Sequence, residues 1–156
     1  MDELLLDTTY ILPLFGLKVN LRDFNANFPM LMSKFLTSYN PIALVESKWI
    51  ILKLIKKNPS KREDLLEAYR VGMNTLMNDH RLRQTMLTDQ RTEEIADNLL
   101  LEEGLNDYVD RLIYATAAHL NYGLLTEDKD LHRIGRSGKL DKPKKITNWE
   151  KLIQEL

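Results

Sequence analysis

The chain has 156 residues, the length of one typical domain, and its 44% hydrophobic and 29% charged residues match a soluble globular protein. It contains no cysteine, which excludes disulfides, thiol catalysis and cysteine-based zinc sites and fits a reducing cytoplasm. No apolar stretch approaches the ~20 residues of a membrane span, and the start lacks the basic opening of a signal peptide. We therefore expect a single domain, residues 1–156, in the cytoplasm.

The formal net charge of −1 hides an uneven distribution. Between residues 47 and 62 there are six basic residues and no acid, and residues 129–145 hold seven Lys or Arg against two Asp. Residues 89–110, by contrast, are strongly acidic. Two interpretations stay open: these runs are solvated helix faces, or they are basic flanks that guide a polyanion towards an acidic centre.

Apolar runs, helical periodicity and turn signals predict short strands separated by helices. In chain order, we expect a strand at 3–7, a short helix at 9–15, helices at 26–38, 41–57 and 61–78, a weak strand at 84–87, helices at 89–103 and 107–122, a strand at 124–126, and an edge strand at 145–149 before a short terminal helix. This alternation indicates an α/β fold, with a mostly parallel sheet and helices on both faces.

Apolar spacing also predicts which helix faces are buried. Asn40 and Pro41 form a strong helix start, with Asn as the N-cap and Pro at the first helical position. Trp49 and Trp149 are interpreted as core or edge packing rather than as platforms for nucleic-acid bases. The predicted buried positions are Ile42, Val45, Trp49 and Leu52 in one helix, Leu65, Leu66, Tyr69, Met73, Leu76 and Met77 in the next, and Val109, Leu112, Ile113, Thr116 and Leu120 near the end.

Four acidic residues occupy informative places. Asp7 and Asp128 each follow a predicted buried strand, which puts them at the sheet edge where ligand sites form in open α/β sheets. Glu46 and Asp110 lie on predicted helices that open near the same edge. A turn, cap or surface role explains any one of these acids alone. Four carboxylates that converge predict a pocket for a hard divalent cation.

The chain resembles PIN-domain proteins along most of its length. The segments that carry the resemblance are Leu4-Leu5-Leu6-Asp7-Thr8, Asn40-Pro41-Ile42-Ala43-Leu44-Val45-Glu46, Asp110-Arg111-Leu112-Ile113-Tyr114-Ala115-Thr116-Ala117, Leu124-Leu125-Thr126-Glu127-Asp128 and Ile146-Thr147-Asn148-Trp149. The resemblance implies an α/β/α sandwich whose acidic centre binds Mg²⁺ or Mn²⁺ and cleaves RNA phosphodiesters. It also implies a homodimer. Many such proteins are VapC-type toxins paired with an antitoxin, and others process or degrade RNA. Residues 61–80 form a longer helical region than the smallest toxin-type domains carry.

Under this resemblance, Asp7, Glu46, Asp110 and Asp128 are the catalytic, metal-binding set. We expect Asp7 and Asp110 to make the closest contacts with one ion. Glu46 and Asp128 then hold water molecules around it or a second ion about 3.5–4 Å away. A hydroxyl of Thr8 or Thr126 is expected to orient one of the carboxylates.

Some assignments remain open. Asp130 lies two residues beyond Asp128 and is an alternative fourth acid, although the family pattern favours the acid two positions after Thr126. Asp107 is interpreted as a helix cap, and whether it also joins the acidic site is left open. A non-catalytic PIN scaffold that binds RNA or a protein partner is one alternative function. A haloacid-dehalogenase-type phosphatase is another, but Thr9 stands where that family carries its second Asp.

Overall fold

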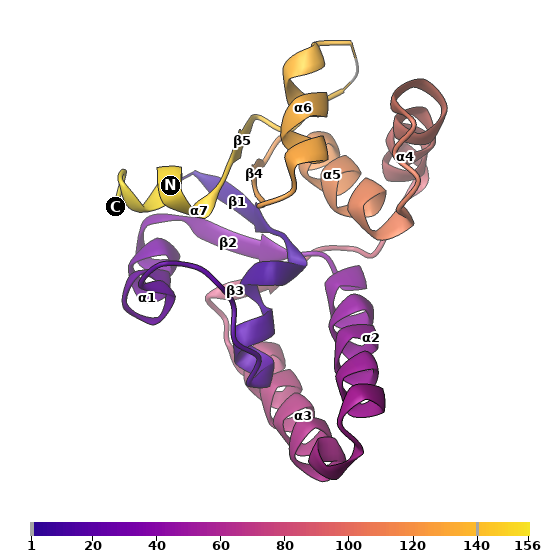
Figure 1. Cartoon of the computed structure of the whole chain (residues 1–156). Helices are drawn as coiled ribbons and strands as arrows, with labels where there is room; N and C mark the ends of the chain where they lie inside the picture. Colours follow the sequence, from indigo (N-terminus) through magenta and orange to yellow (C-terminus); the bar gives the residue numbers. More distant parts are fainter. Residues whose placement is uncertain (1, 140) are drawn as a thin grey trace.

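The computed structural model describes residues 2–139 and 141–156, so residues 1 and 140 of the predicted domain lie outside the described residues. A five-stranded sheet forms its centre, with every strand pair parallel and the strand order β3-β2-β1-β4-β5 (Figure 1). The strands are β1 (Glu3–Leu6), β2 (Leu36–Tyr39), β3 (Leu82–Gln84), β4 (Gly123–Leu125) and β5 (Lys145–Thr147). The helices are α1 (Phe24–Lys34), α2 (Ile42–Lys57), α3 (Arg62–Asn78), α4 (Gln90–Glu103), α5 (Tyr108–Leu120), α6 (Lys129–Ser137) and α7 (Trp149–Ile153), with 3₁₀ turns η1 (Thr8–Tyr10), η2 (Leu12–Phe15) and η3 (Pro59–Lys61).

The central strand β1 explains why the sheet is covered on both faces. Its side chains alternate, so that Leu4 and Leu6 enter one hydrophobic core and Leu5 enters the other. The first core also takes residues of α1, α2, α3 and α7, and the second takes residues of α4, α5 and α6. An apolar run buried on both faces is typical of a strand in a parallel sheet. The predicted α/β sandwich with helices on both faces is therefore confirmed, and the sheet is entirely parallel.

Strand β2 replaces the end of the helix that we predicted at 26–38. Helix α1 stops at Lys34, and Phe35 is extended, with φ −121° and ψ 150°. The strand then pairs with β1 on one side and β3 on the other. Thr37 and Ser38 are buried in it, and the hydroxyl of Thr37 donates to the carbonyl of Arg81 at 2.8 Å. Because these strand residues are polar, the sequence has no apolar run here that would predict a strand.

Other boundaries also differ from the prediction. Strand β3 begins at Leu82 rather than at residue 84, and α6 was not predicted. Helix α5 ends at Leu120 because Asn121 adopts a left-handed conformation, with φ 56°, so Gly123 opens β4 instead of ending the helix. Helix α2 begins at Ile42, one residue after the predicted start at Pro41, and Asn40 accepts from the amide of Ile42 at 2.8 Å. Asp89 caps α4 by accepting from the amide of Thr92.

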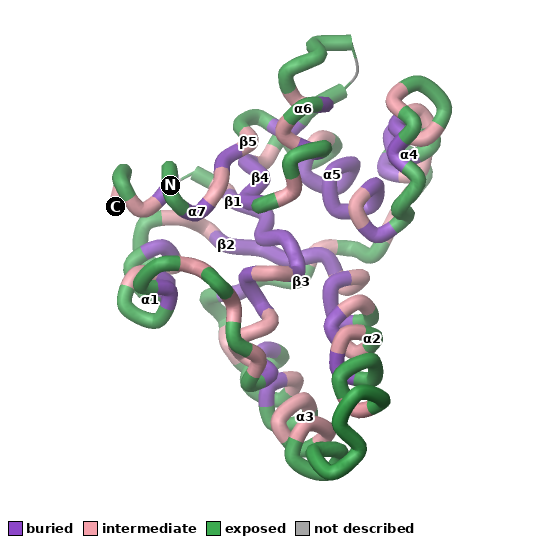
Figure 2. The backbone as a smooth tube through the Cα atoms, in the orientation of Figure 1, coloured by how far each residue is buried: buried purple, intermediate pink, exposed green. Residues whose placement is uncertain are grey.

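The outer face of α2 contradicts the predicted apolar burial. Val45, Trp49 and Leu52 are 43%, 52% and 42% exposed, and the helix packs through its opposite side. That side carries Ala43, Leu44, Ser47 and Ile51, which are buried. Met77 of α3 and Leu120 of α5 are exposed as well, whereas Trp149 is fully buried as predicted. Figure 2 shows exposed residues along much of the length of α2 and α3.

Helices α2 and α3 lie side by side and extend beyond the sheet (Figure 1). Helix α3 also packs closely on η2 at Gly72, where an added Cβ would lie 2.3 Å from the carbonyl oxygen of Leu14. Only glycine allows this approach of the helix to the η2 backbone. Among the described residues, no helix is both long and apolar enough to cross a membrane.

Candidate functional site: an acidic centre at the sheet edge

Asp7 lies at the carboxyl end of β1, where the sheet continues for one more residue through the hydrogen bond from its amide to the carbonyl of Leu125. Its side chain is 8% exposed and caps η1 by accepting from the amide of Thr8 at 2.7 Å. The second carboxylate oxygen accepts from the hydroxyl of Thr126 at 2.5 Å. Burial raises the pKa of Asp7, while the hydrogen bonds from Thr126 and Thr8 oppose the rise.

Thr126 ties Asp7 to the loop that carries Asp128. Its buried hydroxyl donates to Asp7 and accepts from the amide of Asp128 at 3.1 Å. Asp128 then caps α6, because its Oδ1 atom accepts from the amides of Asp130 and Leu131. The expectation that a threonine orients one of the carboxylates is confirmed for Thr126.

Glu46 and Asp110 face the same place from two helices. Burial, followed by the charges of Asp7 and Asp107, raises the pKa of Glu46 from 4.5 to about 7. Burial also raises the pKa of Asp110 from 3.8 to about 7. The charges that add to this second rise are, in decreasing order, those of Asp107, Asp7, Asp128 and Glu46. The fold therefore brings Asp7, Glu46 and Asp128 within electrostatic reach of Asp110. We call these four residues, Asp7, Glu46, Asp110 and Asp128, the acidic centre.

The two ambiguous acids take different positions. Asp107 caps α5, as predicted, by accepting from the amides of Val109 and Asp110 at 2.8 and 3.3 Å. Its charge nevertheless acts on both Glu46 and Asp110, which the cap assignment did not anticipate. Asp130 has a side chain that is 68% exposed and is 3.6 Å from Arg133. The geometry thus favours Asp128 over Asp130 as the fourth member of the centre.

The donor set fits a hard divalent cation bound through few direct contacts. Within residues 2–139 and 141–156, no three acidic or histidine side chains lie close enough together to hold one ion at once. Mg²⁺ usually takes only one or two direct carboxylates and keeps several water molecules, so the four acids can share an ion through water. The buried hydroxyl of Thr8 has no partner at full hydrogen-bonding distance in the described part of the chain, but it lies close enough to Glu46 to lower the pKa of that carboxyl. A buried hydroxyl beside these carboxylates offers a hydrated cation one more oxygen atom.

Glu127 is a structural residue of this region that the sequence did not reveal. It accepts from the phenol of Tyr10 at 2.5 Å and from the amide of Trp149 at 2.8 Å. These bonds connect the loop before α6 to η1 and to α7. Burial and the neighbouring Glu127 carboxylate raise the pKa of Tyr10, which keeps the phenol protonated as a donor. A lone Glu between Thr126 and Asp128 offers no sequence pattern that distinguishes such a role.

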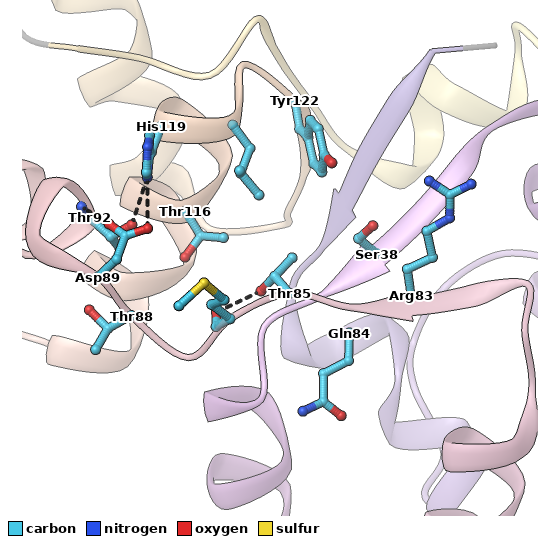
Figure 3. A pocket seen from close by; sticks show the side chains of 12 residues that line it. Ser38, Arg83, Gln84, Thr85, Thr88, Asp89, Thr92, Thr116, His119 and Tyr122 are labelled. Atoms are coloured by element: carbon cyan, nitrogen blue, oxygen red, sulfur yellow. Dashed lines mark hydrogen bonds and ion pairs between the residues drawn. The ribbon is translucent and has the colours of Figure 1, made fainter.

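A pocket of about 240 Å³ lies elsewhere, between β2, β3, α4 and α5. In Figure 3, His119 points towards Asp89 and Thr92, and its Nδ1 atom is 3.2 Å from an oxygen of each. Asp89 already caps α4. None of the four acids lines this pocket. His119, Asp89 and Thr92 are engaged with one another, and the pocket is separate from the acidic centre.

A second groove, of about 390 Å³, adjoins the acidic centre directly. Glu46, Trp49 and Lys53 line it from α2, and Asp107 and Tyr108 line it from the start of α5. This groove is the only one of the described cavities in which a member of the acidic centre takes part.

Comparison with known proteins places this arrangement in a family. The family model of the PIN domain matches residues 4–137, which are most of the chain and include all four acids. The chain therefore belongs to the PIN domain family. PIN domains are generally nucleases, and those nucleases typically use divalent metals. No curated protein matches the chain significantly.

Several solved structures share the fold. VapBC2 from Rickettsia felis, solved bound to a DNA fragment from its promoter, matches with a TM-score of 0.63 at 19% identity, covering 94% of this chain and 98% of that one. VapBC-5 from Mycobacterium tuberculosis matches with a TM-score of 0.57 at 15% identity and coverages of 95% and 98%. A toxin–antitoxin complex from Klebsiella pneumoniae matches with a TM-score of 0.54 at 20% identity and coverages of 88% and 92%. At these identities the likeness establishes the fold, and the phosphatase alternative is left without support.

Proposed function

We propose that this protein, as a single PIN-like domain in the cytoplasm, is an endoribonuclease that requires Mg²⁺ or Mn²⁺ and hydrolyses RNA phosphodiester bonds. The observation that carries the proposal is the acidic centre itself. Two of its carboxyl groups have a pKa near 7, because burial and like charges disfavour their ionised forms. Such crowding destabilises a fold, and a bound cation offsets the repulsion.

The position of each acidic residue indicates its role. Asp7 lies deepest and is held rigidly by Thr126 and Thr8, so we assign it a direct contact with the cation, together with Asp110. Glu46 and Asp128 orient water molecules around the cation, or contact a second ion. When bound, a divalent cation shields the phosphate charge and makes an attacking water more acidic.

The first experiment measures RNA cleavage by the purified protein with Mn²⁺ and again after EDTA is added. We expect cleavage only with the metal. Asp7→Asn and Asp110→Asn should abolish it, while circular dichroism shows that both variants keep the fold. Full activity in either variant, after contaminating nuclease has been excluded, would remove that residue from the site.

Asp128 and Asp130 provide a matched comparison within one loop. Asp128→Asn should lose activity. Asp130→Asn should remain active, because its exposed carboxylate lies beside Arg133 rather than among the four acids. Activity lost in Asp130→Asn and kept in Asp128→Asn would move the site to Asp130.

A second candidate role is that of the toxin in a VapBC-type pair. The names of the matching solved structures favour it, because all three are toxin–antitoxin proteins. It predicts that a protein encoded beside this one binds it and stops RNA cleavage, and that a homodimer forms. Cleavage that no neighbouring gene product inhibits would favour a role in RNA processing. A protein that binds RNA and never cuts it with any divalent ion would instead be a non-catalytic PIN scaffold.

A further inference from the structure

Trp49 is exposed where its size argues for burial. Its side chain is 52% exposed on the outer face of α2, although tryptophan is among the side chains most buried on average. Within the described residues it joins no aromatic pair, unlike Trp149, which packs against Tyr10 and Phe24. Trp49 shares this outer face with Val45 and Leu52, which are also exposed, and an exposed apolar stripe beside a candidate site indicates a binding surface.

The groove beside the acidic centre is where this side chain lies. Its volume is about 390 Å³, and its lining includes Glu46, Trp49, Ile50 and Lys53 from α2 with Asp107 and Tyr108 from the start of α5. Glu46 thus belongs both to the groove and to the acidic centre. A molecule that reaches the acidic centre along this side meets the indole of Trp49 within one helical turn of Glu46.

The α5 side of the groove is fixed in place. The phenol of Tyr108 donates to Glu93 at 2.5 Å, and the guanidinium of Arg111 lies 5.0 Å from the centre of its ring. Tyr108 is 43% exposed, so part of the ring still faces solvent. The groove therefore combines one anchored aromatic wall with one exposed indole. This arrangement suits a flat, partly apolar group such as a nucleobase.

The charges on α2 favour a polyanion as the occupant, although Glu46 and Asp107 also line the groove. Lys53 lines it too, and its charge acts on Glu46. Residues 47–62, which include Lys53, carry six basic residues and no acid, and four of the six follow Lys53. A basic track with an exposed aromatic side chain is the combination by which proteins bind single-stranded nucleic acid. In duplex RNA the bases are already stacked on one another, so an indole can stack only on an unpaired base.

We propose that this groove is a base-binding subsite for single-stranded RNA, in which Trp49 stacks on an unpaired base next to the phosphate that is cut, and Lys53 contacts the backbone. The inference rests on the proposed ribonuclease function and adds to it the residues that hold an unpaired base beside the phosphate that is cut.

Tryptophan fluorescence tests the subsite directly, because the other tryptophan, Trp149, is fully buried. The full-length protein is titrated in EDTA at low salt with an oligoadenylate of about eight nucleotides, a length within the usual range of single-strand sites. We expect the oligoadenylate to quench the exposed tryptophan. The same oligomer without bases should bind more weakly and cause little quenching. Trp49→Phe should remove the quenching and retain most of the binding, whereas Trp49→Leu should weaken binding about tenfold.

Cleavage with Mn²⁺ gives the second readout. Trp49→Leu should raise KM for single-stranded RNA about tenfold, with a smaller effect on kcat, because stacking on a remote base mainly binds the substrate. Leu52→Ala is the matched control: Leu52 is an exposed apolar residue of the same helix that does not line the groove, so this variant should behave like wild type.

The outcomes separate this inference from the proposed function. Wild-type cleavage with equal binding of the two oligomers, or an unchanged KM in Trp49→Leu, overturns the subsite and leaves the ribonuclease intact. Base-dependent quenching without any cleavage supports the subsite and overturns the nuclease. If neither oligomer changes the emission and Leu52→Ala disrupts binding of a partner protein, the outer face of α2 is a protein-docking surface and the RNA subsite is wrong.

Discussion

The replacement of Asp110 by Asn tests the central electrostatic claim, because it removes one charge from the acidic centre with almost no change in shape. In the folded protein, burial and neighbouring carboxylates raise the pKa of Asp110 from 3.8 to about 7. A difference of that size corresponds to about 4 kcal/mol at most. Asp110 shares its repulsion with Glu46, and surrounding water relaxes around both groups. We therefore expect Asp110→Asn to stabilise the metal-free protein by about 1–2 kcal/mol at pH 7.

The sign of the pH dependence follows from proton linkage. Between about pH 4 and pH 7, the folded state holds a proton on Asp110 that the unfolded state has released. Wild type therefore loses stability as the pH rises through this window, and the variant lacks this contribution. The advantage of Asp110→Asn should be largest at pH 7 and above, and should shrink as the pH falls towards 4.

Thermal unfolding in EDTA and in excess Mn²⁺ provides the assay. A gain of 1–2 kcal/mol corresponds to a Tm increase of about 2–8 °C for a domain of this size. With Mn²⁺ the difference in Tm between Asp110→Asn and wild type should shrink or change sign. Wild type gains binding free energy as RT ln(1 + [L]/Kd), and the variant gains less. Asp97→Asn, which neutralises an exposed acid on α4, controls for net charge. If wild type shows no metal-dependent shift and Asp110→Asn shows no metal-free gain, the four carboxylates do not form one cation site.

Further predictions concern the surroundings of the acidic centre. Thr126→Val removes the hydroxyl that donates to Asp7, so the pKa of Asp7 should rise further. In a plot of cleavage rate against pH, the acid limb should then move to higher pH, and an unchanged limb would show that this hydroxyl does not tune the site. Replacing Lys56 and Lys57 by Gln should weaken RNA binding regardless of sequence and flatten the salt dependence by about one unit of slope for each lost phosphate contact, whereas an unchanged slope would make them solvated surface residues. Gly72→Ala should destabilise the protein by about 1–3 kcal/mol in urea unfolding, because its Cβ would meet the η2 backbone at 2.3 Å, and an undiminished stability would mean that α3 shifts freely.

The parts of the site that the sequence predicted are those tied to strand ends and helix starts. Asp7 follows an apolar run buried on both faces, and Asp107 caps α5 as predicted. These signals are local, because a strand or a cap is defined by a few neighbouring residues. Glu46 and Asp110 were expected near the same edge because their predicted helices open there, and the family resemblance then grouped them with Asp7 and Asp128 as one metal-binding set.

The parts that the sequence missed depend on long-range contacts. The strand around Thr37 and Ser38 is polar and is stabilised by pairing with two other strands, so its own residues predict nothing regular. The stripe through Trp49 has the spacing of a buried face, but α2 packs through the side that carries Leu44 and Ile51 and leaves this stripe outside. Periodicity predicts that one face is apolar, and only the packing decides whether that face meets the core or a partner. The role of Glu127 likewise depends on Trp149, far along the chain.

The hydrogen bond between Thr126 and Asp7 joins residues 119 positions apart, so a chain that is still being synthesised cannot form it until Thr126 has been added. At synthesis rates of about 5–20 residues per second, Asp7 waits roughly 6–24 s before the residue that orients it has even been made. Until then β1 lacks β4, one of its two neighbours in the sheet, and Asp7 lacks both its amide partner Leu125 and its hydroxyl donor. Helix α7, which secures the same loop through Glu127, follows later still. A chain synthesised only as far as residue 125 therefore carries three of the four acids but cannot yet assemble the acidic centre.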